Sequence, residues 1–304
     1  MREEPYIYMI KRIKNFIRNI NYLTKHSLWQ QRESDIVYLT KKIIDDVGYE
    51  FNLIDNKHGL DVLNKEKSFE FLKKYKSSFV RFGDGEINLL KGEDQPFQKY
   101  DVEIAKRLFS LLSKPREDIK ICLNYDYFSP FGSMYTEDSD YNLRFAFDYR
   151  LFFIRNCNPN NTYLDGAVTF WYRLGENSEG SRKFWFDWKE FFRDEKIAVI
   201  CGEGILKKLK YDIFEFAKDI IYIYGPSKHA WSEKDRIILE IEKKCSKEYR
   251  LAFILGMAGK AIIPEMVDKG YTAWDIGHLA KGYDLFMKNT FINSSVVGDF
   301  FKPD

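Results

Sequence analysis

The stretch Ser77-Ser78-Phe79-Val80-Arg81-Phe82-Gly83-Asp84-Gly85-Glu86 decides both the fold class and the candidate site of this chain. Its apolar run, residues 79–82, ends at a glycine, and this pattern predicts a buried strand followed by a turn. Asp84 and Glu86 follow directly, so two carboxylates lie one residue apart, beside glycines that let a ligand approach closely. Hard oxygen donors of this kind suit Mg²⁺ or Mn²⁺ together with phosphate. The alternative interpretation is a turn that carries two solvated acids.

The composition is that of a globular protein. The chain has 304 residues, of which 45% are hydrophobic, and this is enough for one large domain or two small ones. Its net charge is +2 with acids and bases mixed, so no nucleic acid is expected as a partner. The cysteines match neither a zinc site nor a disulfide framework, and we expect Cys122 and Cys201 to be small buried residues. Such usage suits a reducing cytoplasm, and no apolar run has the length of a membrane span or a signal sequence.

From Ser77 onward, short apolar runs alternate with helical patterns. Strands are predicted at Phe79–Phe82, Ile119–Leu123, Ile197–Cys201, Ile220–Tyr224, Leu251–Leu255 and Thr272–Trp274. Helices are predicted at Val102–Leu112, Tyr141–Asn156, Arg182–Phe192, Glu233–Lys244 and Ala258–Lys269. This alternation is typical of an α/β fold with a mostly parallel, Rossmann-like sheet and helices on both faces. We therefore expect an N-terminal helical extension over 1–60, one α/β domain over 66–290 and a C-terminal tail over 291–304.

The N-terminal extension contains a basic amphipathic helical pattern over residues 6–23. Its isoleucines fall at helical spacing, and Lys11, Lys14 and Arg18 lie elsewhere around the wheel. Such a helix can lie peripherally on the inner face of an anionic membrane. Alternatively, it covers an apolar surface of its own domain or of a second subunit in a homo-oligomer. Both interpretations stay open at this point.

The middle of the chain, from Tyr125 to Trp188, is rich in aromatic residues. These side chains form either a lid that stacks on sugar rings or ordinary packing. Packing is favoured by the helical spacing of Phe184, Trp185, Trp188 and Phe191.

Polar and glycine-rich segments follow every predicted strand. Ligands of open α/β sheets bind beyond the carboxyl ends of the strands, and glycines there open backbone amides and helix N-termini to phosphate. The segments on this predicted rim are Gly83-Asp84-Gly85-Glu86, Asn124-Tyr125-Asp126, Gly202-Glu203-Gly204, Gly225-Pro226-Ser227-Lys228-His229, Gly256-Met257-Ala258-Gly259-Lys260 and Asp275-Ile276-Gly277-His278. Their convergence predicts a phosphate-binding site, although glycine after a strand is also ordinary turn chemistry.

Two motifs resemble those of a known family. The string Val80-Arg81-Phe82-Gly83-Asp84-Gly85-Glu86, with Pro96-Phe97-Gln98 and Tyr100-Asp101 downstream, is similar to the signature of the GT-D fold glycosyltransferases, formerly domain of unknown function 1792. The segment Gly270-Tyr271-Thr272-Ala273-Trp274-Asp275-Ile276-Gly277-His278 is similar to the closing motif of that family. The resemblance covers about residues 66–290, and the chain departs from the family pattern after Gly204 and at residues 256–259.

The resemblance implies a metal-dependent glycosyltransferase. Such an enzyme moves a sugar from a nucleotide-sugar donor, typically a UDP-sugar, to a bacterial surface glycan or glycoprotein. Asp84 and Glu86 would correspond to the Asp-x-Glu metal motif and would hold Mn²⁺ or Mg²⁺ against the diphosphate. Glu203 is a candidate general base for the acceptor hydroxyl, or simply an acid in a turn. The candidate donor-binding residues are Arg81, Gly83, Gly85, Gly202, Gly204, Ser227, Gly256, Lys260 and His278.

Some of these residues have structural alternatives. Arg81 and Lys260 are expected to make charge-assisted contacts with phosphate. His278 binds metal or phosphate, or only holds the rim loop by a hydrogen bond. His229 and Asp275 are weaker candidates.

Two other functions remain as alternatives. The segment Ile200-Cys201-Gly202-Glu203-Gly204 can be interpreted as the nucleoside-binding loop of an S-adenosylmethionine-dependent, methyltransferase-like enzyme. That interpretation gives Asp84 and Glu86 no purpose. The other alternative is a non-catalytic module that binds a glycan or a partner glycosyltransferase.

Overall fold

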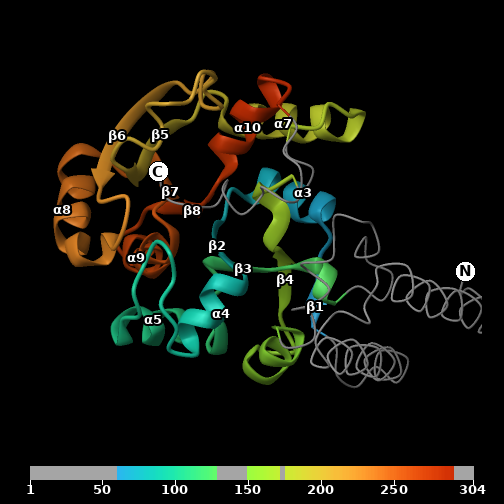
Figure 1. Ribbon diagram of the computed structural model, residues 1–304, viewed down its shortest axis with the longest axis vertical. Helices are drawn as coiled ribbons and strands as arrows, with labels where there is room; N and C mark the ends of the chain where they lie inside the picture. Colours follow the sequence, from blue (N-terminus) through green and yellow to red (C-terminus); the bar gives the residue numbers. More distant parts are fainter. Residues whose placement is uncertain (1–59, 129–148, 172–174, 291–304) are drawn as a thin grey trace, which may run out of the picture.

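One parallel sheet organises the protein. The computed structural model describes residues 60–128, 149–171 and 175–290. Within them, eight strands form a sheet of order β1-β4-β3-β2-β8-β7-β5-β6 (Figure 1). All neighbouring strands in it are parallel. The strands are β1 (Asp61–Val62), β2 (Ser78–Phe82), β3 (Ile119–Leu123), β4 (Thr162–Asp165), β5 (Lys196–Gly202), β6 (Asp219–Gly225), β7 (Tyr249–Ile254) and β8 (Thr272–Asp275).

Helices cover both faces of the sheet, as Figure 1 shows. One core cluster joins the first face to α4 (Asp84–Leu90), α5 (Val102–Ser113), α8 (Lys234–Lys244), α9 (Gly256–Asp268) and a helical segment, 149–156. A second cluster joins the opposite face to α3 (Lys65–Tyr75), α7 (Glu179–Phe192) and α10 (Leu279–Met287). Short 3₁₀ turns occur at Tyr125–Tyr127, Gly166–Thr169 and Ala230–Glu233.

The apolar patterns of the sequence explain these layers. All residues of β5 after Lys196 are buried, as expected for a parallel strand that is covered on both faces. Helix α7 buries Trp185, Trp188 and Phe191 against the sheet, and the Trp188 indole N–H donates to the Val168 carbonyl at 3.0 Å. For these side chains, the packing interpretation of the aromatic-rich middle is confirmed.

The six predicted strands are all present, and the predicted α/β class is confirmed. The sequence patterns missed β1 and β4 because both are short and carry polar residues. They also missed α3, α4 and α10, and α4 begins at Asp84, where only a turn was expected. The N-terminal pattern 6–23 and the tail 291–304 lie outside the described residues.

The four cysteines are free and buried, which confirms the expectation for Cys122 and Cys201. Among the described helices, none has the length and apolar character needed to cross a membrane.

Candidate active site

The connections of β2 and β8 leave the sheet toward opposite faces. Strand β2 leads into α4, which packs on the first face, and β8 leads into α10, which packs on the second. The two strands are neighbours, with Phe79 in register with Trp274. In an open parallel sheet, such a switch of direction opens a crevice at the carboxyl ends of the strands, where ligands bind. The sheet topology therefore places the candidate site at the ends of β2 and β8.

Arg81 and Asp275 join these two strand ends. The backbone N–H of Arg81 donates to Asp275 Oδ2 at 3.1 Å, and its Nη2 donates to Oδ1 at 3.1 Å. Nε donates to the Asp275 backbone carbonyl at 3.0 Å. Burial alone would raise the pKa of Asp275, but the charges of Arg81 and Lys260 outweigh it and hold that pKa below its usual range. The sequence made Asp275 a weaker candidate, yet this carboxylate contacts both Arg81 and Lys260.

Glu86 and Lys260 extend this arrangement to α4 and α9. Lys260 Nζ lies 2.5 Å from Glu86 Oε1 and 3.6 Å from Asp275 Oδ2. Glu86 Oε2 accepts the Gly83 N–H at 2.8 Å, so this carboxylate also caps the first turn of α4. Glu86, Lys260 and Asp275 are 6%, 6% and 2% exposed. Together with Arg81 they form a buried network of two cations and two carboxylates, which we call the switch-point network.

His278 lies beside the switch-point network, at the N-terminus of α10. Burial, together with the positive charges of Arg81 and Lys281, lowers the pKa of His278 to about 3. Its imidazole is therefore neutral at pH 7. A neutral imidazole can accept a hydrogen bond or bind a metal, but it adds no positive charge for a phosphate.

Asp84 is the residue that offers this site a carboxylate outside the network. It is half-buried and opens α4, next to the N-cap Gly83. No group of three or more acid, histidine or cysteine side chains with metal-site geometry occurs in the described part of the chain. A divalent ion that takes one carboxylate and fills its other positions with phosphate and water fits this arrangement, whereas an all-protein cage does not.

A turn between α4 and α5 lies over this rim, and the sequence analysis did not assign it to the site. Gln95 and Gln98 exchange backbone hydrogen bonds of 2.9 and 3.1 Å, so Pro96 and Phe97 form the two-residue tip. The Phe97 carbonyl accepts the His229 N–H at 2.7 Å, and its ring centroid lies 6.2 Å from that of His278. The signal available beforehand was the motif Pro96-Phe97-Gln98, which carried no chemistry by itself.

Glu203 and its glycines lie apart from the switch-point network. They follow β5, which is separated from β2 by β7 and β8, a distance of roughly 14 Å at about 4.8 Å per strand. The Glu203 side chain is exposed. Gly202 is required by packing, because a Cβ there would lie 2.7 Å from the Ser227 Cα. The structure therefore brings together Arg81, Glu86, Lys260, Asp275 and His278, but not Glu203.

A second buried group lies on the other side of β2, at the ends of β3 and β4. Asp126 and Asp165 are 9% and 4% exposed. Burial raises the pKa of Asp165 to about 6, although the positive charge of Lys65 opposes it. Asp165 accepts the Ala167 N–H at 2.9 Å and the Tyr125 N–H at 3.2 Å, so it also holds two turns together.

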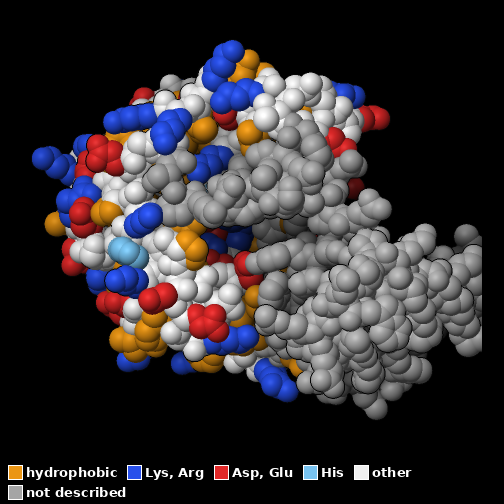
Figure 2. All heavy atoms as spheres, viewed as in Figure 1, with side chains coloured by type: hydrophobic (Ala, Val, Ile, Leu, Met, Phe, Trp, Pro, Cys, Tyr) orange, Lys and Arg blue, Asp and Glu red, His pale blue; other side chains and the backbone are white. Residues whose placement is uncertain are grey.

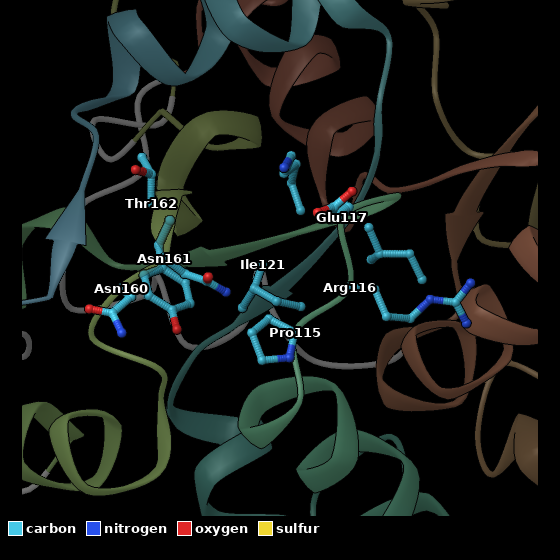
Figure 3. A pocket seen from close by; sticks show the side chains of 10 residues that line it. Pro115, Arg116, Glu117, Ile121, Asn160, Asn161 and Thr162 are labelled. Atoms are coloured by element: carbon cyan, nitrogen blue, oxygen red, sulfur yellow. The ribbon is translucent and has the colours of Figure 1, made fainter.

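A surface pocket at the amino ends of the strands, opposite the candidate site, does not belong to this site. Figure 3 shows its lining, which includes Pro115, Arg116 and Thr162. These residues lie at the amino ends of β3 and β4, and Arg116 is already paired with Asp118 and Asp268. On the face shown in Figure 2, acidic and basic side chains of the described residues are interspersed.

Comparison with known proteins agrees with the fold. A profile of the family described as "Glycosyltransferase GT-D fold" matches residues 79–297, which include the whole switch-point network. The chain belongs to this family. Its sequence is 26% identical over 238 residues to a "Probable glycosyl transferase Gly" of Streptococcus gordonii. It is also 26% identical over 226 residues to "Glycosyltransferase GlyD" of Streptococcus pneumoniae.

These two relatives are much longer proteins. The matches cover 75% and 74% of this chain, but only 33% and 27% of the relatives. A solved structure of domain of unknown function 1792, described as having a distinct glycosyltransferase fold, superposes with a TM-score of 0.67. It is 28% identical, and the match covers 75% of this chain and 82% of that one. A structure from Streptococcus sanguinis, described as a new glycosyltransferase, has the same TM-score at 24% identity and shows the fold alone.

Proposed function

We propose that this GT-D chain is a glycosyltransferase that binds a nucleotide-sugar donor, a UDP-sugar, at the switch point between β2 and β8. The acceptor would be a bacterial surface glycan or glycoprotein. The observation that carries the proposal is the switch-point network at the ends of β2 and β8, beside His278 and the N-terminus of α10 and within reach of α9 through Lys260. The family membership and the names of the relatives support the reaction class.

The helix N-termini at the carboxyl ends of β7 and β8 suit a diphosphate. Helix α9 begins after Leu255 and α10 after His278, and neither N-cap side chain makes a cap hydrogen bond. By contrast, Asn64, Asp101 and Ser178 cap α3, α5 and α7 with their side chains. Backbone N–H groups at a helix N-terminus, together with the helix dipole, favour anions.

The charges of the site support the use of a divalent ion. Arg81 and Lys260 are already balanced by Asp275 and Glu86, so the switch-point network adds no net positive charge. A bound diphosphate therefore needs a further cation, and Asp84 would hold Mn²⁺ or Mg²⁺ beside it. When bound, such an ion neutralises charge on the leaving diphosphate. Asp84 orients this cation, and the network keeps Asp84 at the crevice.

Two carboxylates are candidate bases for the acceptor hydroxyl. Glu203 is exposed beyond β5, whereas Asp126 is buried beyond β3, directly next to β2. The variants E203Q and D126N test which of the two carboxylates is the base. The variant that loses sugar transfer but keeps metal-dependent hydrolysis of the donor marks the base, because hydrolysis needs no acceptor.

Ligand binding tests the proposal against its alternatives. We expect UDP with Mn²⁺ to raise the melting temperature of the protein and S-adenosylmethionine to leave it unchanged, because only ligands of the folded state stabilise it. A shift with S-adenosylmethionine alone would favour the methyltransferase-like alternative. Binding of glycans without any response to UDP and Mn²⁺ would favour the non-catalytic module.

The cellular context is also a proposal. We propose that the protein works in the cytoplasm and that residues 6–23 attach it reversibly to the inner face of the membrane. The basic residues of this segment would each contribute about 1 kcal/mol at an anionic surface, so attachment would be sensitive to salt. Deleting residues 1–26 should then abolish binding to anionic liposomes while the protein stays monodisperse. Aggregation or a changed oligomeric state would instead show that the segment covers protein surface.

A further inference from the structure

The two carboxylates of the Asp-x-Glu motif occupy different environments. We propose that Glu86 is a positioning residue that does not bind the metal, and that Asp84 alone supplies the protein carboxylate to a divalent ion. The inference rests on the proposed function, since it assigns roles within the metal and diphosphate site. The sequence pattern assigns metal binding to both residues, whereas the inference assigns metal binding to Asp84 and positioning to Glu86.

The contacts of Glu86 leave it poorly suited to a metal. One oxygen accepts the Gly83 N–H at 2.8 Å, and the other lies 2.5 Å from Lys260 Nζ. An ion bound to the second oxygen, at the usual Mg²⁺ distance of about 2.1 Å, would lie within about 5 Å of the ammonium group. Both groups are buried, so solvent would screen this repulsion little. The negative charge of Glu86 is therefore already balanced by Lys260, and a metal ion is not needed for this purpose.

The same contacts explain how Glu86 positions Asp84. Through Lys260, Glu86 ties the first turn of α4 to α9, and through its bond to the Gly83 N–H it fixes the N-cap next to Asp84. The two helices are in close contact here, because a Cβ on Gly85 would lie 3.0 Å from the Met257 Cε. Lys260 in turn approaches Asp275, which holds Arg81. Ion pairs that reach across four elements thus hold the first turn of α4, which carries Asp84.

The experiment compares D84N, E86Q, K260M and the double variant E86Q/K260M. For each protein, UDP binding is titrated with Mn²⁺, which gives the Mn²⁺ concentration at half-maximal binding. Urea unfolding of the same proteins gives their stability. Glutamine at 86 can still accept the Gly83 N–H, and the double variant removes the ion pair without leaving a lone buried charge.

We expect D84N to raise the required Mn²⁺ concentration by at least about tenfold while the unfolding midpoint stays unchanged. E86Q and K260M should each lower the unfolding midpoint, because E86Q leaves Lys260 with only its longer contact to Asp275 and K260M leaves the buried Glu86 without a counter-charge. E86Q/K260M should recover the midpoint and return the Mn²⁺ requirement toward the wild-type value, because glutamine at position 86 still accepts the Gly83 N–H and holds the N-cap next to Asp84. A metal ligand could not be rescued in this way, since removing Lys260 supplies no new oxygen donor.

Two results would overturn the inference. If E86Q/K260M folds with the wild-type midpoint but needs as much Mn²⁺ as D84N, Glu86 is a ligand and the proposed function still stands. If the wild-type protein binds UDP without any dependence on Mn²⁺, the metal-assisted function fails, and the division of roles fails with it. The stability data remain informative in both cases, because they report the Glu86–Lys260 coupling without any ligand.

Discussion

The guanidinium of Arg81 occupies the space in which a side chain on Gly277 would begin. A Cβ built on Gly277 would overlap the Arg81 Nη2 atom, and its distance to the Arg81 Nη1 atom would be only 3.2 Å. Gly277 also has a φ of +51°, in the left-handed region that disfavours other residues. Two independent constraints therefore require glycine at this position, two residues after the Asp275 that binds Arg81.

We expect Gly277→Ala to displace Arg81 from Asp275 and to weaken both folding and UDP binding. Gly270→Ala is the matched control, because Gly270 also has a positive φ, of +87°, but a Cβ there meets nothing within 4 Å. The control should lose about 1 kcal/mol of unfolding free energy through backbone strain alone. Gly277→Ala should lose clearly more in urea denaturation. Equal losses for the two variants would show that Arg81 moves aside at no cost.

Arg81→Lys tests whether the planar fork matters beyond its charge. Lysine can reach the Asp275 carboxylate, but it cannot also donate to the backbone carbonyl as Nε does. We expect a loss of about 1–3 kcal/mol in unfolding free energy, because buried acceptors lose their partners. Arg107→Lys is the control, since Arg107 pairs with Glu103 and Glu265 at the half-exposed surface. Its loss should stay below about 1 kcal/mol. Similar losses of unfolding free energy for both variants would show that the planar guanidinium of Arg81 contributes nothing beyond its charge.

The strands could be predicted from the sequence, whereas the contacts among the residues that follow them could not. Runs such as Ile197–Cys201 are apolar throughout, so their strands can be recognised without knowledge of their neighbours. The Arg81–Asp275 contact joins residues that are 194 positions apart, and only the pairing of β2 with β8 brings them together. Asp275 was therefore only a weaker candidate, because nothing in the sequence pattern shows that it contacts Arg81. The sequence pattern does not contain the order of the strands in the sheet. That order places Asp275 next to Arg81 and places Glu203 two strands away from Asp275.

Phe97 offers a second test of the crevice. Its turn is held by backbone hydrogen bonds, and His229 Nδ1 additionally accepts the Lys99 N–H at 3.1 Å, so Phe97→Ala should leave the turn in place. We expect UDP binding in Mn²⁺ to weaken roughly fivefold, because an aromatic contact of about 1 kcal/mol is lost. Tyr100→Ala is the control in the same loop, since that side chain is 43% exposed. Calorimetry that gives equal affinities for both variants would place the Phe97 ring outside the donor site.

The pH dependence of stability tests the two buried titratable groups against each other. Native His278, with its pKa lowered to about 3, stays neutral where the unfolded chain takes up a proton, below about pH 6.5. The free energy of unfolding therefore falls as the pH drops, by up to about 1.4 kcal/mol per unit. Asp165 acts in the opposite direction. With its pKa raised to about 6, it keeps a proton that the unfolded chain loses above about pH 4, so its contribution is lost as the pH rises from 4 to 6.

Between pH 4 and 6, these two contributions oppose each other in the wild-type protein. Asp165→Asn should remove one of them, because asparagine can still accept the Tyr125 and Ala167 N–H groups. Stability should then fall more steeply with acid than it does in the wild type. His278→Asn should have the reverse effect and flatten the loss or turn it into a gain. Urea denaturation at half-unit steps from pH 4 to 7 gives the difference curves. Parallel curves for all three proteins would show that neither group keeps its shifted pKa in solution.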